Sequence, residues 1–74
     1  MDTTIELTTE TIALAAALKL ADVVGSGGEA KLLIQEGLVQ LNGMRETRRG
    51  VKVRVGDSIL VDVDPQVRIT VGAA

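Results

Sequence analysis

Five of the eight basic residues of this 74-residue chain lie within ten positions of one another. The set consists of Arg45, Arg48, Arg49, Lys52 and Arg54, and Lys31 precedes it on a predicted helix. Like charges this close repel one another unless an anion is nearby, and the planar guanidinium of arginine fits the oxygens of a phosphate group. The cluster therefore predicts a surface that contacts a nucleic-acid backbone. For any one of these residues, a solvated strand face is the simpler interpretation.

The charges are unevenly distributed along the chain, whose net charge is −2. Residues 23–54 carry six basic and three acidic residues, whereas residues 1–22 carry one basic and four acidic residues. Residues 55–74 again carry one basic residue and three acidic ones. A positive segment between two acidic ends is the pattern expected of a local anion-binding surface, and it argues against indiscriminate binding to every polyanion.

Other site chemistries are poorly supported by the residue types present. The chain has no cysteine and no histidine, which excludes disulfides, thiolate or imidazole metal sites and the usual nucleophile pairs. No pair of carboxylates stands in a context that marks a catalytic site, so we expect no enzyme activity, no metal, no cofactor and no small-molecule substrate. The run from Gly25 to Gly28 could cradle a phosphate, but it lacks a Walker ending and follows no strand. A helix cap with a tight turn is the favoured interpretation.

The chain also has no aromatic residue, so no side chain offers a ring on which an unpaired base could stack. A folded or double-stranded RNA therefore fits better than a single strand. The N-terminus lacks the basic and apolar regions of a secretion signal, and the longest apolar run, from Ile12 to Leu18, is too short to cross a bilayer. We expect a cytoplasmic protein without a membrane partner.

Two helices are predicted in the first half of the chain. The first spans about Thr9 to Val24, which is rich in alanine and leucine, and Gly25 ends it. The second begins at a capping box, in which Ser26 accepts from the amide of Glu29 and Glu29 reaches back to the amide of Ser26. Its apolar stripe contains Ala30, Leu33 and Ile34, and Gly37 is the matching stop.

Alternating residues predict strands from there to the end. Asn42 and Gly43 form a hairpin turn between a strand at 39–41 and a return arm at 44–48. Further strands are predicted at 51–55, with Val51, Val53 and Val55 inward, at 59–63 and at 67–71, and residues 5–7 form a short edge strand. The expected fold is one α+β domain over residues 1–74, with two short adjacent helices followed by a small, mostly antiparallel sheet.

Several short runs together resemble a known family. They are Ser26 to Lys31, Ile34 to Val39, Leu41 to Gly43, Glu46 to Gly50 and Val55 to Asp57. This combination is similar to the RNA-binding domain named after small-subunit ribosomal protein S4, also called the αL motif. Within that family the chain looks most like the small, stand-alone bacterial members of the YbcJ/YaaA type. The resemblance covers about residues 10–63.

The resemblance implies RNA binding by the start of the second helix, by that helix and by the adjoining strands. Carried onto this chain, the implied contacts are Ser26, Lys31, Arg45, Arg48 and Arg49, flanked by Lys52 and Arg54. Ribosomal or transfer RNA is the implied partner, with association with the ribosome. The first helix departs from the family pattern, since larger relatives begin it with Arg-Leu-Asp and further basic residues, and no catalytic domain is attached here.

One alternative function comes from another class of protein. The chain could be a protein-interaction or self-association module, which would use the basic face for an acidic partner or the apolar first helix for a second copy. A preference for RNA over heparin at matched salt would separate the two functions.

Overall fold

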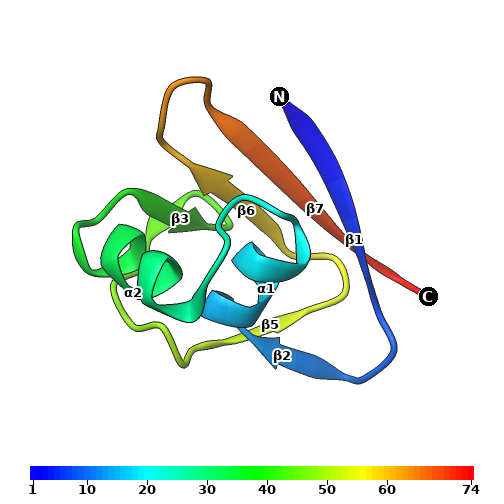
Figure 1. Cartoon of the computed structure of the whole chain (residues 1–74). Coiled ribbons are helices and arrows are strands. Elements are labelled where there is room, and N and C mark those ends of the chain that lie inside the picture. The colour runs from blue at the N-terminus through cyan, green and yellow to red at the C-terminus, as the bar shows by residue number, and fades with distance from the viewer.

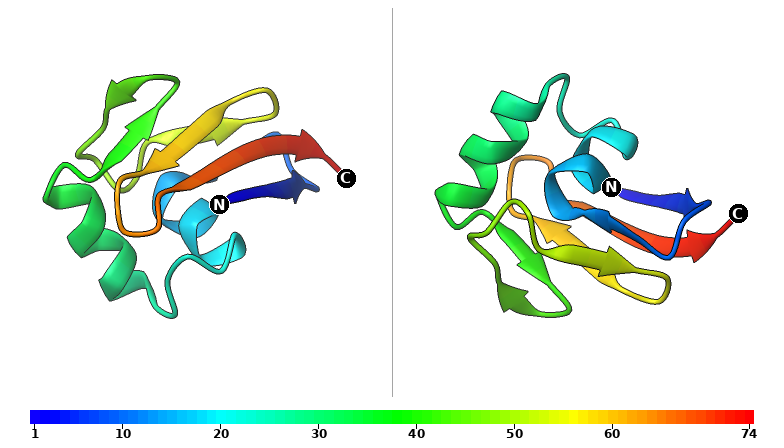
Figure 2. Two further views of the ribbon diagram at one scale, coloured as in Figure 1. Left: turned by 90° about the horizontal axis from the view of Figure 1, so that it is seen from above. Right: turned by 90° about the horizontal axis from the view of Figure 1, so that it is seen from below.

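A five-stranded mixed sheet carries both helices on one of its faces (Figure 1). The computed structural model describes residues 1–74. The elements in chain order are β1 (Asp2–Leu7), β2 (Thr11–Ala13), α1 (Leu14–Leu20), α2 (Gly27–Gln35), β3 (Val39–Leu41), β4 (Met44–Arg45), β5 (Lys52–Arg54), β6 (Ser58–Val61) and β7 (Val67–Ala73). The two views of Figure 2 show the helices on one side and the main sheet on the other.

The sheet order is β1-β7-β6-β3-β4, in which only the β1–β7 pair is parallel. The strands β2 and β5 form a separate antiparallel ribbon beside α1. Two short helices with a mostly antiparallel sheet confirm the predicted α+β class. The edge strand predicted at 5–7 is present but longer, since β1 begins at Asp2 and pairs with β7, the last strand along the chain.

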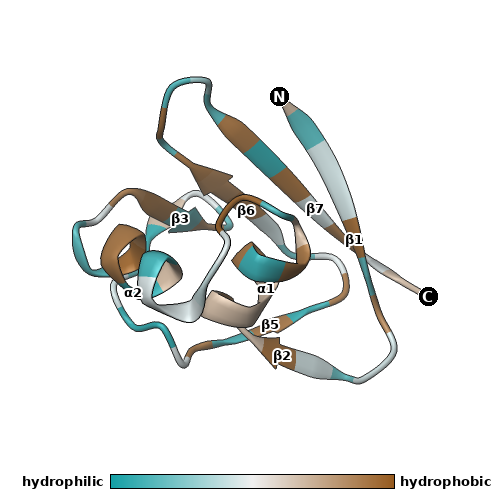
Figure 3. Cartoon of the chain, in the orientation of Figure 1, coloured by the Kyte–Doolittle hydropathy of each residue, from teal (hydrophilic) through white to brown (hydrophobic).

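Aliphatic side chains alone fill the interior, and no polar side chain is buried. The fully buried large residues come from every layer: Leu14, Leu18, Ile34, Val39, Val53, Val61, Ile59 and Ile69. In Figure 3, apolar positions in brown recur along α1, α2 and the strands, and on β7 they alternate with hydrophilic positions in teal. Each such side chain contributes roughly 1.5–3 kcal/mol by leaving water. No helix is long or apolar enough to cross a membrane, and the longest, α2, has nine residues.

The first helix is shorter than predicted, and its predicted first turns are a strand. Residues 11–13 form β2, which pairs with β5 so that Ile12 lies opposite Val53. The amide of Leu14 then donates to the carbonyl of Val51 at 2.9 Å, and that of Ala15 to Arg49 at 3.2 Å. The β-branched pair Thr11 and Ile12 favours this extended backbone over a helix. The prediction of a helix from about Thr9 was therefore wrong.

The first helix also ends earlier than predicted. Its last residue is Leu20, and Asp22 takes the terminating position that was predicted for Gly25. Asp22 has a φ of 59°, in the left-handed region that aspartate tolerates better than most residues. The amide of Asp22 donates to Lys19 O at 3.0 Å, and that of Val23 donates to Leu18 O at 3.1 Å. This pair of hydrogen bonds is the Schellman motif, which is usually built on glycine.

The second helix confirms its predicted ends. Ser26 caps it, with its hydroxyl accepting from the Glu29 amide at 3.2 Å, and Gly37 follows its last turn with a φ of 77°. One half of the capping box differs, because the Glu29 carboxylate accepts from the amide of Gly25, at 3.4 Å, instead of that of Ser26. The predicted apolar stripe is inward, with Ala30 and Ile34 buried.

The hairpin at Asn42 and Gly43 is confirmed, since both residues have positive φ and Leu41 lies opposite Met44. Its return arm, however, ends at Arg45 instead of Arg48. The strand predicted at 51–55 is also shorter. Val53 is buried between exposed Lys52 and Arg54, but Val55 is exposed because the chain turns there toward Gly56, whose φ is 95°.

Candidate nucleic-acid interface

The basic cluster of the sequence is carried by α2, β4, the loop 46–51 and β5. We call this set the basic surface: Lys31, Arg45, Arg48, Arg49, Lys52 and Arg54. The loop 46–51 leaves β4, passes beside α2 and leads into β5 (Figures 1 and 2). The six residues of the basic surface thus come from separate elements of the fold.

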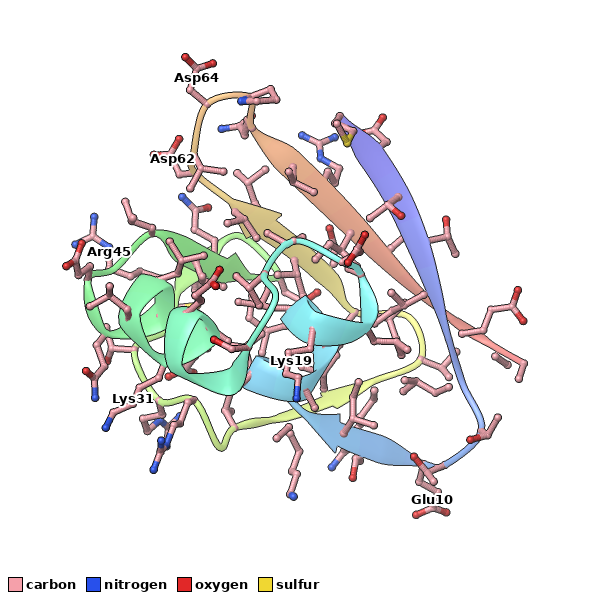
Figure 4. All side chains as sticks on the ribbon, viewed as in Figure 1. Glu10, Lys19, Lys31, Arg45, Asp62 and Asp64 are labelled. Carbon is pink, nitrogen blue, oxygen red and sulfur yellow. The ribbon has the colours of Figure 1, made fainter.

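Helix α2 contributes Lys31 and presents its N-terminus beside it. Figure 4 shows the half-buried Lys31 pointing outward from α2. Ser26 is also predicted to belong to the site, and its hydroxyl oxygen accepts one hydrogen bond from the Glu29 amide. Its hydroxyl proton is left to donate, which is the form of hydrogen bond a phosphate oxygen accepts. A side chain on Gly27 would meet no heavy atom within 4 Å, so the approach to this end of the helix is open.

Arg45 lies at the other end of α2, on strand β4 (Figure 4). Its alkyl chain crosses Gly37, because a Cβ built on that glycine would lie 3.1 Å from Arg45 Cδ and 3.3 Å from Nε. The guanidinium is therefore held near the carbonyl end of the helix, where a positive charge is favourable. The glycine has two functions, since it ends the helix in the left-handed region and leaves room for this side chain.

The loop with Arg48 and Arg49 is fixed to the rest of the fold by its backbone. The amide of Glu46 donates to the carbonyl of Val39 at 3.0 Å, which continues the hairpin by one hydrogen bond. At the other end of the loop, the carbonyls of Arg49 and Val51 accept from the first amides of α1. These contacts satisfy helix donors that otherwise lack a partner, so the same bonds begin α1 and hold the loop in place.

Glu46 organises the first part of this loop. Its carboxylate accepts from the backbone amides of Thr47 and Arg48, each at 3.1 Å, and from Nε and Nη2 of Arg48, at 3.1 and 3.3 Å. The hydrogen bonds from Arg48 hold the pKa of Glu46 below its ordinary value, and the same carboxylate raises the pKa of Arg48. The Glu46 side chain is 16% exposed and that of Arg48 77%, so the pair lies at the surface with the arginine outward.

Strand β5 presents Lys52 and Arg54 to solvent on the face opposite buried Val53. The backbone of Arg54 is fixed, since its amide donates to the carboxylate of Asp57 at 2.8 Å. Asp57 in turn accepts from the side-chain amide of Asn42 at 3.0 Å, which ties the hairpin turn to the turn after β5.

Several acidic side chains lie away from the basic surface, although Glu29 is in α2, Glu36 is its C-cap and Glu46 begins the loop 46–51. Figure 4 shows Lys31 and Arg45 on the side of α2, Asp62 and Asp64 at the turn between β6 and β7, and Glu10 beside β2. The structure contains one ion pair, between Glu46 and Arg48. The other five members of the basic surface have no ionic partner within the chain.

Two determinants of this site were missed by sequence reasoning. Glu46 was counted as a charge and as part of a family-like run, but its hydrogen bonds to the next two backbone amides and to Arg48 were not predicted. A carboxylate just before two free amides is a known signal for such local bonds. Gly37 was read as a helix stop without its contact to Arg45, which depends on the pairing of β3 with β4 and has no local signal.

Comparison with known proteins identifies the family of this chain. A family model described as the S4 domain matches residues 5–70. The chain is also similar to a Bacillus subtilis (strain 168) protein named "Probable ribosome maturation protein RlbA", with 45% identity over 58 residues that cover 78% of this chain and 82% of that protein. The match extends beyond the residues 10–63 that carried the resemblance. The chain therefore belongs to the S4 domain family.

Proposed function

We propose that this protein binds structured ribosomal RNA through the basic surface, as a non-enzymatic module that acts in the cytoplasm during ribosome maturation. The observation that carries the proposal is a set of five cations without an ionic partner on α2, β4, β5 and the loop that joins β4 to β5, in a chain that is acidic elsewhere. Membership in the S4 domain family and the name of the Bacillus relative support RNA and the ribosome as the setting.

The binding mode follows from the residue types available. Arginine and lysine contact phosphate oxygens, and Ser26 donates its hydroxyl proton to one of them at the start of α2. With no aromatic ring in the chain, stacking on unpaired bases contributes nothing. Backbone contacts therefore provide the affinity, and the shape of a folded RNA provides the selectivity.

The salt dependence of RNA affinity tests this mode, because each phosphate contact adds about one unit to the log–log slope. We expect Arg49→Ala to lower the slope by about one unit. Arg48→Ala should lower it less, since Glu46 already offsets the charge of Arg48. Arg68→Ala is the matched control, because Arg68 is an exposed arginine on β7, outside the basic surface. Equal slopes for wild type, Arg48→Ala and Arg49→Ala would rule out this surface as the RNA site.

Crosslinking in cells, followed by sequencing of the attached RNA, tests the proposed target. We expect enrichment on a discrete helix of ribosomal RNA that is lost in an Arg48→Ala/Arg49→Ala double variant and kept in Arg68→Ala. Enrichment on transfer RNA instead would keep the mode and change the target. Equal competition by heparin and RNA at matched salt would favour an acidic protein partner.

A further inference from the structure

Strand β1 has hydrogen-bonding groups that the fold leaves without a partner. It lies at the border of the sheet and pairs only with β7 (Figure 1). The carbonyl of Met1 accepts from the amide of Arg68, and that of Leu7 accepts from the amide of Ala74. The backbone groups of the odd-numbered residues therefore point toward β7. In a parallel pair each residue turns both its backbone groups to the same side. The amides and carbonyls of Asp2, Thr4 and Glu6 therefore point away from the sheet.

The side chains along this edge alternate in character. Ile5 and Leu7 are buried on the helix side of the sheet, whereas Asp2, Thr4 and Glu6 are exposed on the other side. Cations lie at its N-terminal end, where Arg68 is opposite Asp2 and the terminal ammonium donates to Gln66 O at 2.7 Å. Glu6 lies opposite Gly72, which offers no charge. Negative charge along this edge is thus least compensated at Glu6.

A cavity of about 360 Å³ opens at the N-terminal end of the same strand. Its lining includes Met1, Thr3, Val23, Val63, Asp22 and Asp64. Thr3 shares the inner side of β1 with Ile5 and Leu7, so the cavity opens on the same face of the sheet as the inward side chains of an added strand. It is mainly aliphatic, and both ionisable side chains in its lining are acidic.

We propose that the free edge of β1 binds an extended segment of a partner protein in which basic residues alternate with aliphatic ones. The added strand bonds to the outward groups of Asp2, Thr4 and Glu6, as in β-strand addition to other exposed sheet edges. Its basic side chains face Asp2 and Glu6, and its aliphatic side chains pack on the inner face beside Thr3 and Ile5. This surface is separate from the basic surface and does not depend on RNA binding.

A second copy of this chain fits the edge poorly. A symmetric antiparallel pair centred on Thr4 would place Asp2 directly opposite Glu6 of the other copy, twice. Like charges directly opposite one another destabilise a strand pair. The charge pattern therefore disfavours self-pairing in this register, whereas a basic strand places opposite charges across the edge.

The test uses the full chain and a synthetic peptide that alternates lysine with valine. Thr4→Pro removes an outward amide without touching the bonds to β7, a position at which an edge strand accepts proline. Thr4→Val is the matched control, because it keeps the amide. We expect calorimetry to give about tenfold weaker binding for Thr4→Pro than for Thr4→Val. Glu6→Gln should weaken binding more than Asp2→Asn.

Amide exchange gives a second readout on the wild-type protein. The peptide should slow exchange at Asp2, Thr4 and Glu6, and a peptide N-methylated at alternate residues should fail to do so. Circular dichroism establishes that each variant is folded. Equal affinity of Thr4→Pro and Thr4→Val, unchanged exchange along β1, or no binding of the alternating peptide would each overturn the proposal.

Discussion

Replacing Gly37 with alanine would perturb the junction between α2 and the basic surface. Gly37 has a φ of 77°, in the left-handed region where a Cβ is crowded by the neighbouring carbonyl. The new methyl group would also lie 3.1 Å from Cδ of Arg45, closer than ordinary van der Waals contact. The substitution therefore has two separate energetic costs, one from the backbone conformation and one from the contact with Arg45.

The backbone cost is about 1–2 kcal/mol for a residue with a Cβ in this region. Part of it is offset by the smaller conformational freedom of alanine in the unfolded chain, worth about 0.4–1 kcal/mol. The contact with Arg45 adds to the cost, because the arginine must leave its position over the glycine. We expect a net loss of about 1–2 kcal/mol, which lowers the unfolding temperature by about 4–16 °C in a domain of this size.

Thermal unfolding followed by far-ultraviolet circular dichroism measures this loss, since the chain has no tryptophan or tyrosine to report by fluorescence. Gly27→Ala is the matched control, because a Cβ there meets no heavy atom within 4 Å and the residue begins a helix. It should unfold at the wild-type temperature or slightly above it. A Gly37→Ala protein that unfolds within about 1 °C of the wild type would refute the reasoning.

A double variant separates the two costs. In Gly37→Ala/Arg45→Ala the backbone cost remains, but the contact with the arginine side chain is gone. We expect the double variant to lose less stability than the sum of the single variants, because the two residues touch. Strict additivity would show that the arginine moves aside without cost.

Two further substitutions test the local contacts of the site. Ser26→Ala should lower the free energy of unfolding by about 0.5–2 kcal/mol in urea titrations, because the Glu29 amide loses its acceptor, and Ser26→Asp should restore most of it. Glu46→Gln should destabilise the protein at neutral pH but not in acid. Because the pKa of Glu46 is lower in the folded state than its ordinary value of 4.5, its ionised form stabilises the fold in full above that value, and this contribution is lost as the pH falls through the lower pKa. Unfolding temperatures of wild type and Glu46→Gln that differ equally at every pH would contradict this assignment.

Short-range signals in the sequence predicted much of the architecture. The Ser26 cap, the Gly37 stop and the Asn42-Gly43 turn are each decided by a few adjacent residues, and all three lie where expected. The alternation of valines and isoleucines also identified β6 and β7 as half-buried strands. The basic segment could be identified because charged residues can be counted in a sequence without knowledge of its fold.

The errors fall where a distant partner decides the local structure. Residues 11–13 were predicted to begin a helix because an alanine-rich run follows them. Pairing with β5 makes them a strand instead. Asp22 terminates α1 in a left-handed conformation that glycine usually adopts. The prediction therefore placed the end of the helix at Gly25, three residues later. The ion pair between Arg48 and Glu46 likewise depends on the geometry of the loop, which cannot be inferred from counting charges.

The first and last strands along the chain, β1 and β7, are direct neighbours in the sheet, with Asp2 opposite Arg68. A chain synthesised from its N-terminus must therefore hold β1 without its only sheet neighbour until β7 has been made. During that interval Ile5 and Leu7 lack the cover that β7 provides, while Asp2 and Glu6 beside them keep the segment charged. Such charges next to an aliphatic strand oppose association between nascent chains. Closing the sheet depends on contacts between the two ends of the chain, which are the slowest kind to form.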